Sequence, residues 1–315
     1  MRPGPARIYS RCGDIPHSAK ERHMKTRTIG FVGVGVMGEP ICRNLARKSG
    51  RMVIAFDRDA APLRRLKQAG VEAAGNIAAL ARACDVIFMA LPSGKHVETV
   101  CAGEDGLLAH TRARQIVVDL GTSPVDLTRS LAAKFADRGA RYADAPIART
   151  REAAEAGTLS IMVGADAETF AAIEPLLACC ATDITHCGPV GSGQIVKILN
   201  NMVLAETVIA LSEALVVARR AGLDGKLLFE TLMKGSADSF ALRNHGMKAV
   251  LPNIFPERAF STDYMRKDLG YALDLAENVG AKIHGAELAA RLLEEASEAG
   301  FGDFYWPVVS RVIGA

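Results

Sequence analysis

Three polar residues inside an otherwise apolar stretch are the first candidates for chemistry in this chain. Lys197, Asn200 and Asn201 occupy positions i, i+3 and i+4, so a helix would place them on one face within reach of each other. Under one interpretation, Lys197 is an acid/base catalyst whose orientation Asn201 fixes. Under the other, the lysine extends to the surface and the two amides cap neighbouring backbone. The spacing alone favours neither.

A glycine-rich turn near the start of the chain is a second candidate site. Gly33, Gly35 and Gly38 follow the apolar run 29–32 and precede a helix-like stretch. The first glycine allows a sharp turn, the second lets backbone approach a pyrophosphate, and the third lets helix and strand pack closely. Asp57 closes a second apolar run and could bind an adenosine ribose. Together these residues predict a dinucleotide site facing a helix N-terminus.

The surrounding pattern predicts an α/β fold, with an N-terminal Rossmann domain built on a doubly wound parallel sheet and an all-helical C-terminal domain. Up to residue 188, short β-rich runs alternate with amphipathic segments. The run 86–91 is continuously apolar, as expected where helices cover both faces of a sheet. The expected strands are 28–32, 52–57, 85–91, 115–120, 141–144, 160–164 and 183–187.

Three segments of different composition divide the chain. Residues 27–188 are expected to form the Rossmann domain, and residues 189–315 the helical substrate and oligomerisation domain. Residues 1–26 carry prolines, glycines and basic residues, and we expect a disordered leader there. Because the segment is rich in arginine and poor in acids, a transit peptide is one interpretation. Met24 could equally be the natural start, which would leave residues 1–23 outside the native protein.

The segment 194–220 is apolar on nearly every face, so a helix there would need burial on all sides. Its length is close to that of a membrane span, but Lys197, Glu206 and Glu213 would make a bilayer costly. We therefore expect a buried core or a subunit interface, a homodimer or homotetramer through the helical domain, and no membrane partner. Further helices are expected at 226–234, 264–279 and 285–298.

Composition narrows the classes of partner and the compartment. The 315 residues are 49% hydrophobic and carry a net charge of +3, much of it in the leader, which disfavours a nucleic-acid partner. The seven cysteines are odd in number, scattered, and show no CxxC spacing. Reduced thiols in the cytoplasm and no metal site are therefore expected.

Beyond the strands, two loops should line the ligand crevice, because ligands of such sheets bind past the carboxyl ends of the strands. These loops are 92–94 and 121–124. The whole chain then shows five motifs in a fixed order: 29–40 with its glycines, Met89-Ala90-Leu91-Pro92-Ser93, Asp144-Ala145-Pro146 through Gly157-Thr158-Leu159, Gly191-Ser192-Gly193 followed by Lys197 and Asn200-Asn201, and Lys267-Asp268-Leu269.

From about residue 27 to its end, this set of motifs resembles the β-hydroxyacid dehydrogenases, a family that includes 3-hydroxyisobutyrate dehydrogenase and tartronate semialdehyde reductase. The resemblance implies hydride transfer between a nicotinamide and the carbinol or carbonyl carbon of a short 3-hydroxy acid or semialdehyde. It implies that Lys197 is the acid/base and that Asn201 assists it. The predicted cofactor contacts are Gly33, Gly35, Val36, Met37, Gly38, Asp57, Arg58, Leu91, Pro92, Ser93, Thr122 and Lys267.

Two adjacent residues bear on the choice of cofactor. Asp57 would bind the ribose and repel a 2′-phosphate, which favours NAD(H). Arg58 resembles the arginine of an Asn-Arg pair in the NADP(H)-preferring members of the family. We expect NAD(H), with NADP(H) as the alternative.

The substrate segment departs from the family pattern. Ala148, Arg149 and Thr150 stand where many relatives have Ser-Gly-Gly, and together with Asn200 they are the predicted substrate-binding residues. A guanidinium and a hydroxyl can hold a larger oxyanion, so a small anionic substrate is expected. The trio is similar to that of sulfolactaldehyde reductases, which makes reduction of a sulfonated aldehyde an alternative function. Otherwise Arg149 points to solvent or pairs with an acid such as Glu152.

Three further alternatives stay open. A non-catalytic nucleotide-binding protein would keep the fold, but the presence of Lys197 argues against it. A phosphogluconate-type decarboxylating dehydrogenase shares the architecture, but the helical part here is compact. In the tail, Tyr305 and Trp306 either narrow the pocket near a neighbouring subunit or fill the helical core.

Overall fold

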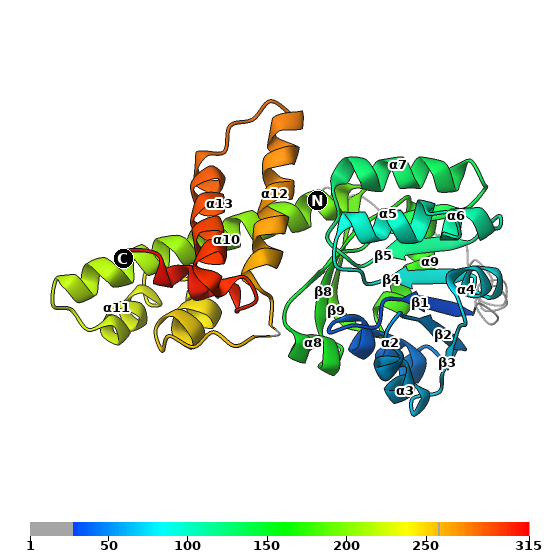
Figure 1. The fold of residues 1–315 in the computed structure, drawn as a ribbon, viewed down its shortest axis with the longest axis horizontal. Coiled ribbons are helices and arrows are strands. Elements are labelled where there is room, and N and C mark those ends of the chain that lie inside the picture. The colour runs from blue at the N-terminus through cyan, green and yellow to red at the C-terminus, as the bar shows by residue number, and fades with distance from the viewer. Residues whose placement is uncertain (1–27, 258, 315) are drawn as a thin grey trace, which may run out of the picture.

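The structure is a computed structural model that describes residues 28–257 and 259–314. Its elements form two lobes, a sheet-based lobe up to residue 188 and a helical lobe from residue 192 onward (Figure 1). The leader predicted for residues 1–26 lies outside the described residues.

The first lobe is built on a nine-stranded sheet in the order β3-β2-β1-β4-β5-β6-β8-β7, with β9 on the free side of β8. The first six strands are all parallel, in the arrangement of a dinucleotide-binding sheet. The predicted Rossmann domain is therefore confirmed. The strands are β1 (Ile29–Val32), β2 (Val53–Phe56), β3 (Val71–Ala73), β4 (Val86–Met89), β5 (Ile116–Asp119), β6 (Arg141–Asp144), β7 (Ile147–Ala148), β8 (Leu159–Gly164) and β9 (Ala181–Gly188).

The far edge of the sheet differs from the fully parallel prediction. β8 runs antiparallel to β6 and β7 and parallel to β9, and neither β3 nor β7 was predicted. Only residues 149–158 connect β7 to β8, and a parallel crossover needs about a dozen residues or more. The short connection therefore forces the chain to turn back on itself at this edge.

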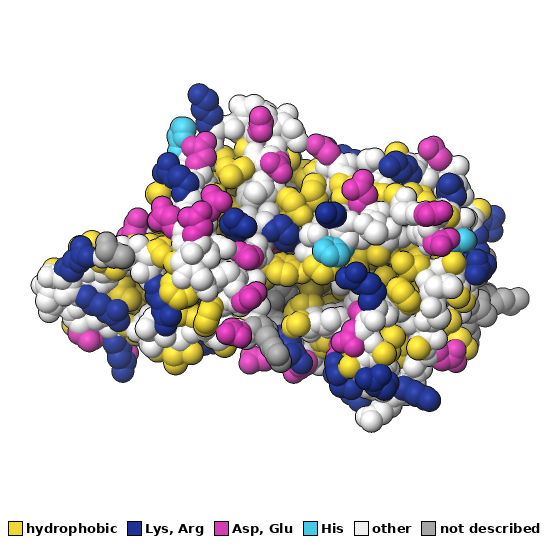
Figure 2. Space-filling model, in the orientation of Figure 1, with side chains coloured by type: hydrophobic (Ala, Val, Ile, Leu, Met, Phe, Trp, Pro, Cys, Tyr) yellow, Lys and Arg dark blue, Asp and Glu magenta, His cyan; other side chains and the backbone are white. Residues whose placement is uncertain are grey.

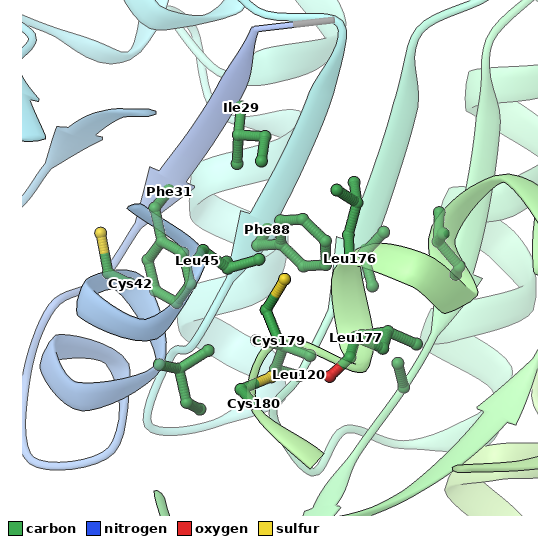
Figure 3. Packing of buried hydrophobic residues seen from close by; sticks show 14 of the residues in the cluster. Ile29, Phe31, Cys42, Leu45, Phe88, Leu120, Leu176, Leu177, Cys179 and Cys180 are labelled. Carbon is green, nitrogen blue, oxygen red and sulfur yellow. Dashed lines mark hydrogen bonds between the residues drawn. The ribbon is translucent and has the colours of Figure 1, made fainter. Parts of the chain in front are cut away.

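Helices cover both faces of the sheet, as the continuous apolar strands predicted. Val86 and Phe88 of β4 contribute to the core on one face, and Ile87 and Met89 to the core on the other. Figure 3 shows the first core, where the Phe31 and Phe88 rings stack at 6.3 Å between centroids. The covering helices are α2 (Gly38–Lys48), α3 (Ala60–Lys67), α8 (Arg151–Ala156) and α9 (Ala167–Leu177) on that face, and α4 (Ile77–Ala83), α5 (Gly94–Ala102), α6 (Leu107–His110) and α7 (Val125–Ala136) on the other.

The second lobe is helical, as predicted, and packs around one long helix that leaves the sheet (Figure 1). Two short helices near residues 246 and 308 escaped prediction because neither shows a sustained apolar period. The elements are α10 (Ser192–Arg220), α11 (Gly225–Leu232), η1 (Leu242–Val250), α12 (Thr262–Asn278), α13 (His284–Ala296), η2 (Ser297–Phe301) and η3 (Trp306–Arg311).

Helix α10 is long and apolar enough to cross a membrane by length and composition alone. It packs against α12, α13, η1 and β8, and 44% of the residues in its most apolar stretch are buried. Burial on all sides is not what the single chain shows, because Val203 and Val217 are 56% and 66% exposed. Of the two expectations for this helix, a buried core accounts for only part of its surface, and the subunit interface stays a prediction.

The aromatic tail fills the helical core. Trp306 is buried, and the Tyr305 hydroxyl lies 2.6 Å from Nδ1 of His245 on η1. Burial raises the pKa of Tyr305 to about 12 and lowers the pKa of His245 to about 4. Within this chain both tail aromatics therefore have a packing role.

Candidate functional site

The glycine loop between β1 and α2 has a shape that fits a pyrophosphate. Gly33 has a φ of 87°, and a Cβ there would lie 2.5 Å from the Ala90 carbonyl oxygen. A Cβ on Gly38 would lie 2.0 Å from the Gly33 oxygen, so helix and strand touch backbone to backbone. Gly35 is exposed, and a Cβ there would meet nothing within 4 Å. The loop is closed at its ends and open at its centre, where phosphates would approach the backbone.

Asp57, at the carboxyl end of β2, is tied to the glycine loop. Its carboxylate accepts the backbone N–H of Val34 at 2.7 Å and that of Asp59 at 2.8 Å. The acid therefore lies beside the loop, where a ribose would follow the pyrophosphate. Arg58 is exposed, and its side chain makes no hydrogen bond or ion pair with another described residue. Val36, at the loop tip, is 52% exposed, and Met37 packs against the core behind it.

The loops after β4 and β5 lie next along the same edge. Leu91, Pro92 and Ser93 follow β4, and the N–H of Gly94 donates to the Tyr271 hydroxyl of α12 at 3.2 Å. This bond joins the two lobes beside the predicted nucleotide loop. Thr122 lies in the loop after β5. The buried side chain of Asp119 holds this loop in its conformation.

Asp119 closes β5 in the same way that Asp57 closes β2. It accepts the N–H of Gly121 and the hydroxyl of Ser123, both at 2.8 Å. Burial raises the pKa of Asp119 to about 7. The two hydrogen bonds lower this pKa, and the nearby Asp144 charge raises it. A Cβ on Gly121 would lie only 3.0 Å from the Leu91 oxygen, so a side chain at this position would crowd the loop.

The first turn of α10 is anchored to the end of β6 by a carboxylate. Asp144 accepts the N–H of Gly191 at 2.6 Å and the N–H of Gln194 at 2.8 Å. A Cβ on Gly193 would lie 2.8 Å from the same carboxylate and 2.4 Å from the Met162 oxygen. The Gly-Ser-Gly motif therefore wraps around Asp144, and the negative charge faces a helix N-terminus, where it is stabilising.

Lys197 lies one turn further along α10. It is half-buried, and its ammonium pairs with no residue in the part of the chain that the structure describes. Burial lowers the pKa of Lys197, the Lys267 charge lowers it further, and the Asp268 carboxylate opposes both. The amine is thus shifted towards its neutral form while staying free for another partner.

A polar network from α12 meets this part of α10. Asn201 is buried and donates to Oδ2 of Asp268 at 2.7 Å, while Asn200 donates to Oδ1 of Asn201 at 3.1 Å. Nζ of Lys267 lies 2.8 Å from Oδ1 of Asp268, between the rings of Tyr264 and Tyr271. The structure therefore brings Lys197, Asn201 and Lys267 together around Asp268.

The predicted substrate segment lies at the edge formed by β7, β8 and β9. Arg149 has a φ of 84°, unusual for a residue with a side chain. Its guanidinium donates to the Thr158 oxygen at 2.6 Å, to Thr182, and to Asp183 at 2.7 Å. The acid paired with Arg149 is thus Asp183 rather than Glu152. Thr182 and Arg149 lower the pKa of Asp183.

The other members of that segment are also in local use. The Thr150 hydroxyl caps α8, and Ala148 pairs with Ser160 in the sheet. In this structure Arg149 and Thr150 therefore have partners of their own. Substrate binding by either side chain would require it to leave these partners, and that role stays a prediction.

Several residues of the site were missed in the sequence. Asp119 ends an apolar strand, so the signal that found Asp57 applies to it too, whereas Asp144 ends the more polar strand β6. Asp268 was noticed as part of a motif but given no role. Gln194 had only the weak signal of a polar residue in an apolar helix, although it is completely buried.

Two family profiles match almost the whole described chain. Residues 28–188 match the NAD binding domain of 6-phosphogluconate dehydrogenase. Residues 191–304 match the NAD-binding domain of NADP-dependent 3-hydroxyisobutyrate dehydrogenase. The boundary between the two profiles coincides with the start of α10.

Individual proteins agree with the profiles. The chain is 36% identical to 2-(hydroxymethyl)glutarate dehydrogenase of Eubacterium barkeri, over 88% of this chain and 92% of that protein. It is 32% identical to the NAD-dependent L-serine dehydrogenase of Pseudomonas aeruginosa, over 91% of this chain and 97% of that protein. The structure of Mycobacterium tuberculosis 3-hydroxyisobutyrate dehydrogenase with L-serine superposes with a TM-score of 0.84 at 31% identity, covering 92% of this chain and all of that one.

Proposed function

The chain belongs to the β-hydroxyacid dehydrogenase family, and we propose that it interconverts a short 3-hydroxy acid and its semialdehyde, with Lys197 as the acid/base. The observation that carries this proposal is the free, half-buried Lys197 beside Asn201 and Asp268, on the helix that starts at the carboxyl ends of β5 and β6. Ligands of an open parallel sheet bind at this edge.

The open Gly35 backbone and Asp57 would hold the cofactor, with the loops at Leu91–Ser93 and Thr122 further along the same edge. When bound, the nicotinamide accepts or supplies the hydride. In the oxidation, the neutral amine of Lys197 takes the hydroxyl proton as the carbon loses its hydride and the C=O bond forms. In the reduction, the ammonium returns that proton to the carbonyl oxygen. Asn201, held by Asp268, would orient the reacting oxygen.

The lowered pKa of Lys197 supports both directions. An ordinary lysine, with a pKa near about 10.4, is almost entirely protonated at neutral pH and makes a poor base. Burial shifts this amine towards the neutral form that the oxidation needs. The Asp268 carboxylate limits the shift, so the ammonium required for reduction is retained as well.

We propose NAD(H) as the preferred cofactor, because the Asp57 carboxylate lies beside the glycine loop and would repel a 2′-phosphate. Arg58 is exposed and free to meet such a phosphate, so NADP(H) is the alternative. Steady-state kcat/KM with each cofactor decides between them. A clear preference for NADP(H) would show that Arg58 outweighs Asp57.

The substrate class is tested with a panel of acids assayed with NAD⁺ and with NADP⁺. The panel contains 3-hydroxyisobutyrate, 2-(hydroxymethyl)glutarate and L-serine, because similar proteins are named for these compounds. Tartronate semialdehyde and sulfolactaldehyde are assayed in the reducing direction. Turnover of a carboxylate supports the proposal, higher kcat/KM on the sulfonate favours the alternative, and turnover of none contradicts both.

The helical lobe also supports an oligomer. Val203, Val217, Leu227, Phe240 and Ile254 are each more than half exposed in the single chain. We propose that a second copy covers part of this apolar surface in a homodimer or homotetramer. Light scattering after size exclusion measures the mass directly, and Val217→Glu should lower it. A monomeric wild type would contradict the proposal.

A further inference from the structure

Gln194 connects the helix of Lys197 to the loop after β5. Its Oε1 accepts the N–H of Ser123 at 3.1 Å, and its Nε2 donates to the Gly121 oxygen at 2.9 Å. One side-chain amide thus pairs with the carbonyl oxygen before Thr122 and with the N–H after it. Gln194 is completely buried, so water does not replace these bonds.

The backbone of the same residue is fixed to a different strand. The N–H of Gln194 donates to Asp144 at the end of β6. Asp119 folds the loop from the opposite side through Gly121 and Ser123. The loop and the first turn of α10 are therefore locked to each other through two buried carboxylates and one buried amide.

Lys197 follows Gln194 by three residues on α10, so the two side chains lie on adjoining parts of one helix face. A shift of the loop relative to Gln194 would change the distance between whatever the loop holds and the lysine amine. Thr122, a predicted cofactor contact, lies at the centre of that loop.

We propose that Gln194 is a positioning residue that sets the register between the cofactor-side loop 121–123 and the amine of Lys197. The inference rests on the proposed function, in which hydride and proton must reach one carbonyl group from two sides. Displacements of about 1 Å in such an arrangement can cost about a hundredfold in rate. The Gln194 amide supplies both the donor and the acceptor that the loop backbone requires.

Substitution with methionine tests the inference, because Gln194→Met keeps the length and removes both hydrogen bonds. Gln194→Glu is the graded variant, since it keeps the acceptor for Ser123 and loses the donor to Gly121. Gln115→Met is the matched control. Gln115 is also buried, and its Nε2 donates to the Ala81 and Cys84 oxygens at 2.8 Å, far from α10 in the sheet lobe.

The first measurement is turnover of the best panel substrate, with and without deuterium at the carbinol carbon. Gln194→Met should lower kcat by about ten- to a hundredfold and raise the primary isotope effect, because hydride transfer becomes the slow step. NADH affinity, from fluorescence titration, should change little. Gln194→Glu should fall in between, and Gln115→Met should lower only the melting temperature. Wild-type kcat and isotope effect in Gln194→Met would overturn the inference.

The second measurement does not depend on activity. Backbone hydrogen exchange in loop 120–124 should rise in Gln194→Met and stay at the wild-type level in Gln115→Met. Unchanged exchange in the first variant would overturn the inference even if turnover fell. A wild type that turns over nothing in the panel would instead contradict the proposed substrate class, and the exchange comparison would still decide the role of Gln194.

Discussion

The two sides of the candidate site are held in different ways. On the side that we propose for the cofactor, called the cofactor side below, the glycine loop takes its shape from the backbone, with the positive φ of Gly33 and the close contact of Gly38. On the side that we propose for proton transfer, called the proton-transfer side below, the first turns of α10 take their position from the buried side chains of Asp144, Gln194 and Asp268. The conformation of the first side thus depends on glycines, which have no side chain, and that of the second depends on buried polar side chains.

This difference determines what can disturb each side. Atoms added to the glycine loop would block it, because the tight contacts that shape the loop at Gly33 and Gly38 are made by backbone atoms. Buried carboxylates, in contrast, must lose their hydration, and burial raises the pKa values of both Asp119 and Asp144. The proton-transfer side should therefore respond to pH and to isosteric changes of a single group.

The largest expected effect is the loss of the amine itself. Lys197→Ala should lower kcat by at least about a hundredfold, because general acid/base catalysis typically contributes 10²- to 10⁴-fold. NADH affinity should remain near the wild-type value, since the lysine belongs to the other side of the site. Lys226→Ala, which removes an exposed amine on α11, is the control. A variant at Lys197 that retained kcat would remove this residue from the mechanism.

Asp119→Asn should change the pH dependence of stability. The folded-state pKa of Asp119 is about 7, above its ordinary value of 3.8, so the folded chain holds this proton more tightly than the unfolded chain. Its stabilising contribution is complete below about pH 4 and is lost as the pH rises through about 7, a change on the order of 4 kcal/mol for a shift of this size. An asparagine amide can keep both partners, so the variant should gain stability over the wild type as the pH rises.

Denaturant unfolding at pH 5 and pH 8 measures this change. The difference in unfolding free energy between Asp119→Asn and wild type should be larger at pH 8. Asp105→Asn, at a side chain that is 95% exposed, controls for the loss of one charge. A pH-independent difference would mean that Asp119 is ionised throughout.

The arrangement of the glycine loop and Asp57 was predictable because its information is local. The bond from Val34 to Asp57 spans only 23 residues, and glycines at fixed spacing after an apolar strand have few other uses. The doubly wound sheet followed from the same alternation of strands and helices. The antiparallel edge did not, because β7 has two residues and no pattern of its own.

The proton-transfer side was only partly predictable. The spacing of Lys197, Asn200 and Asn201 indicated the helix face, but the partners lie far away in sequence. Asn201 is 67 residues from Asp268, and Gln194 is 71 residues from Ser123. Arg149 shows the same limit, since its position in the chain does not reveal that its guanidinium pairs with Asp183 on β9.

Gly35→Ala should affect the cofactor side alone. Gly35 has no positive φ, and a Cβ there meets no atom within 4 Å, so the fold should tolerate alanine. The methyl group would instead occupy the space where a pyrophosphate approaches the loop. We expect NADH affinity to fall by about tenfold, or about 1.4 kcal/mol, with an unchanged melting temperature. Gly75→Ala, at another open glycine, is the control. Unchanged affinity would place the phosphates elsewhere.

The smallest expected effect tests the electrostatic balance around the amine. The Asp268 carboxylate raises the pKa of Lys197 against burial and Lys267, so Asp268→Asn should lower that pKa further. The kcat/KM for oxidation rises with pH as the amine becomes neutral, and this rise should move to lower pH by up to about one unit. The alkaline fall in the reducing direction should move the same way. The single amide oxygen of asparagine can still accept from Asn201, while the contact with Lys267 is lost. Asp263→Asn, an exposed acid on the same helix, should leave both profiles in place. Profiles that moved to higher pH in Asp268→Asn would show that a group other than Lys197 titrates in the reaction.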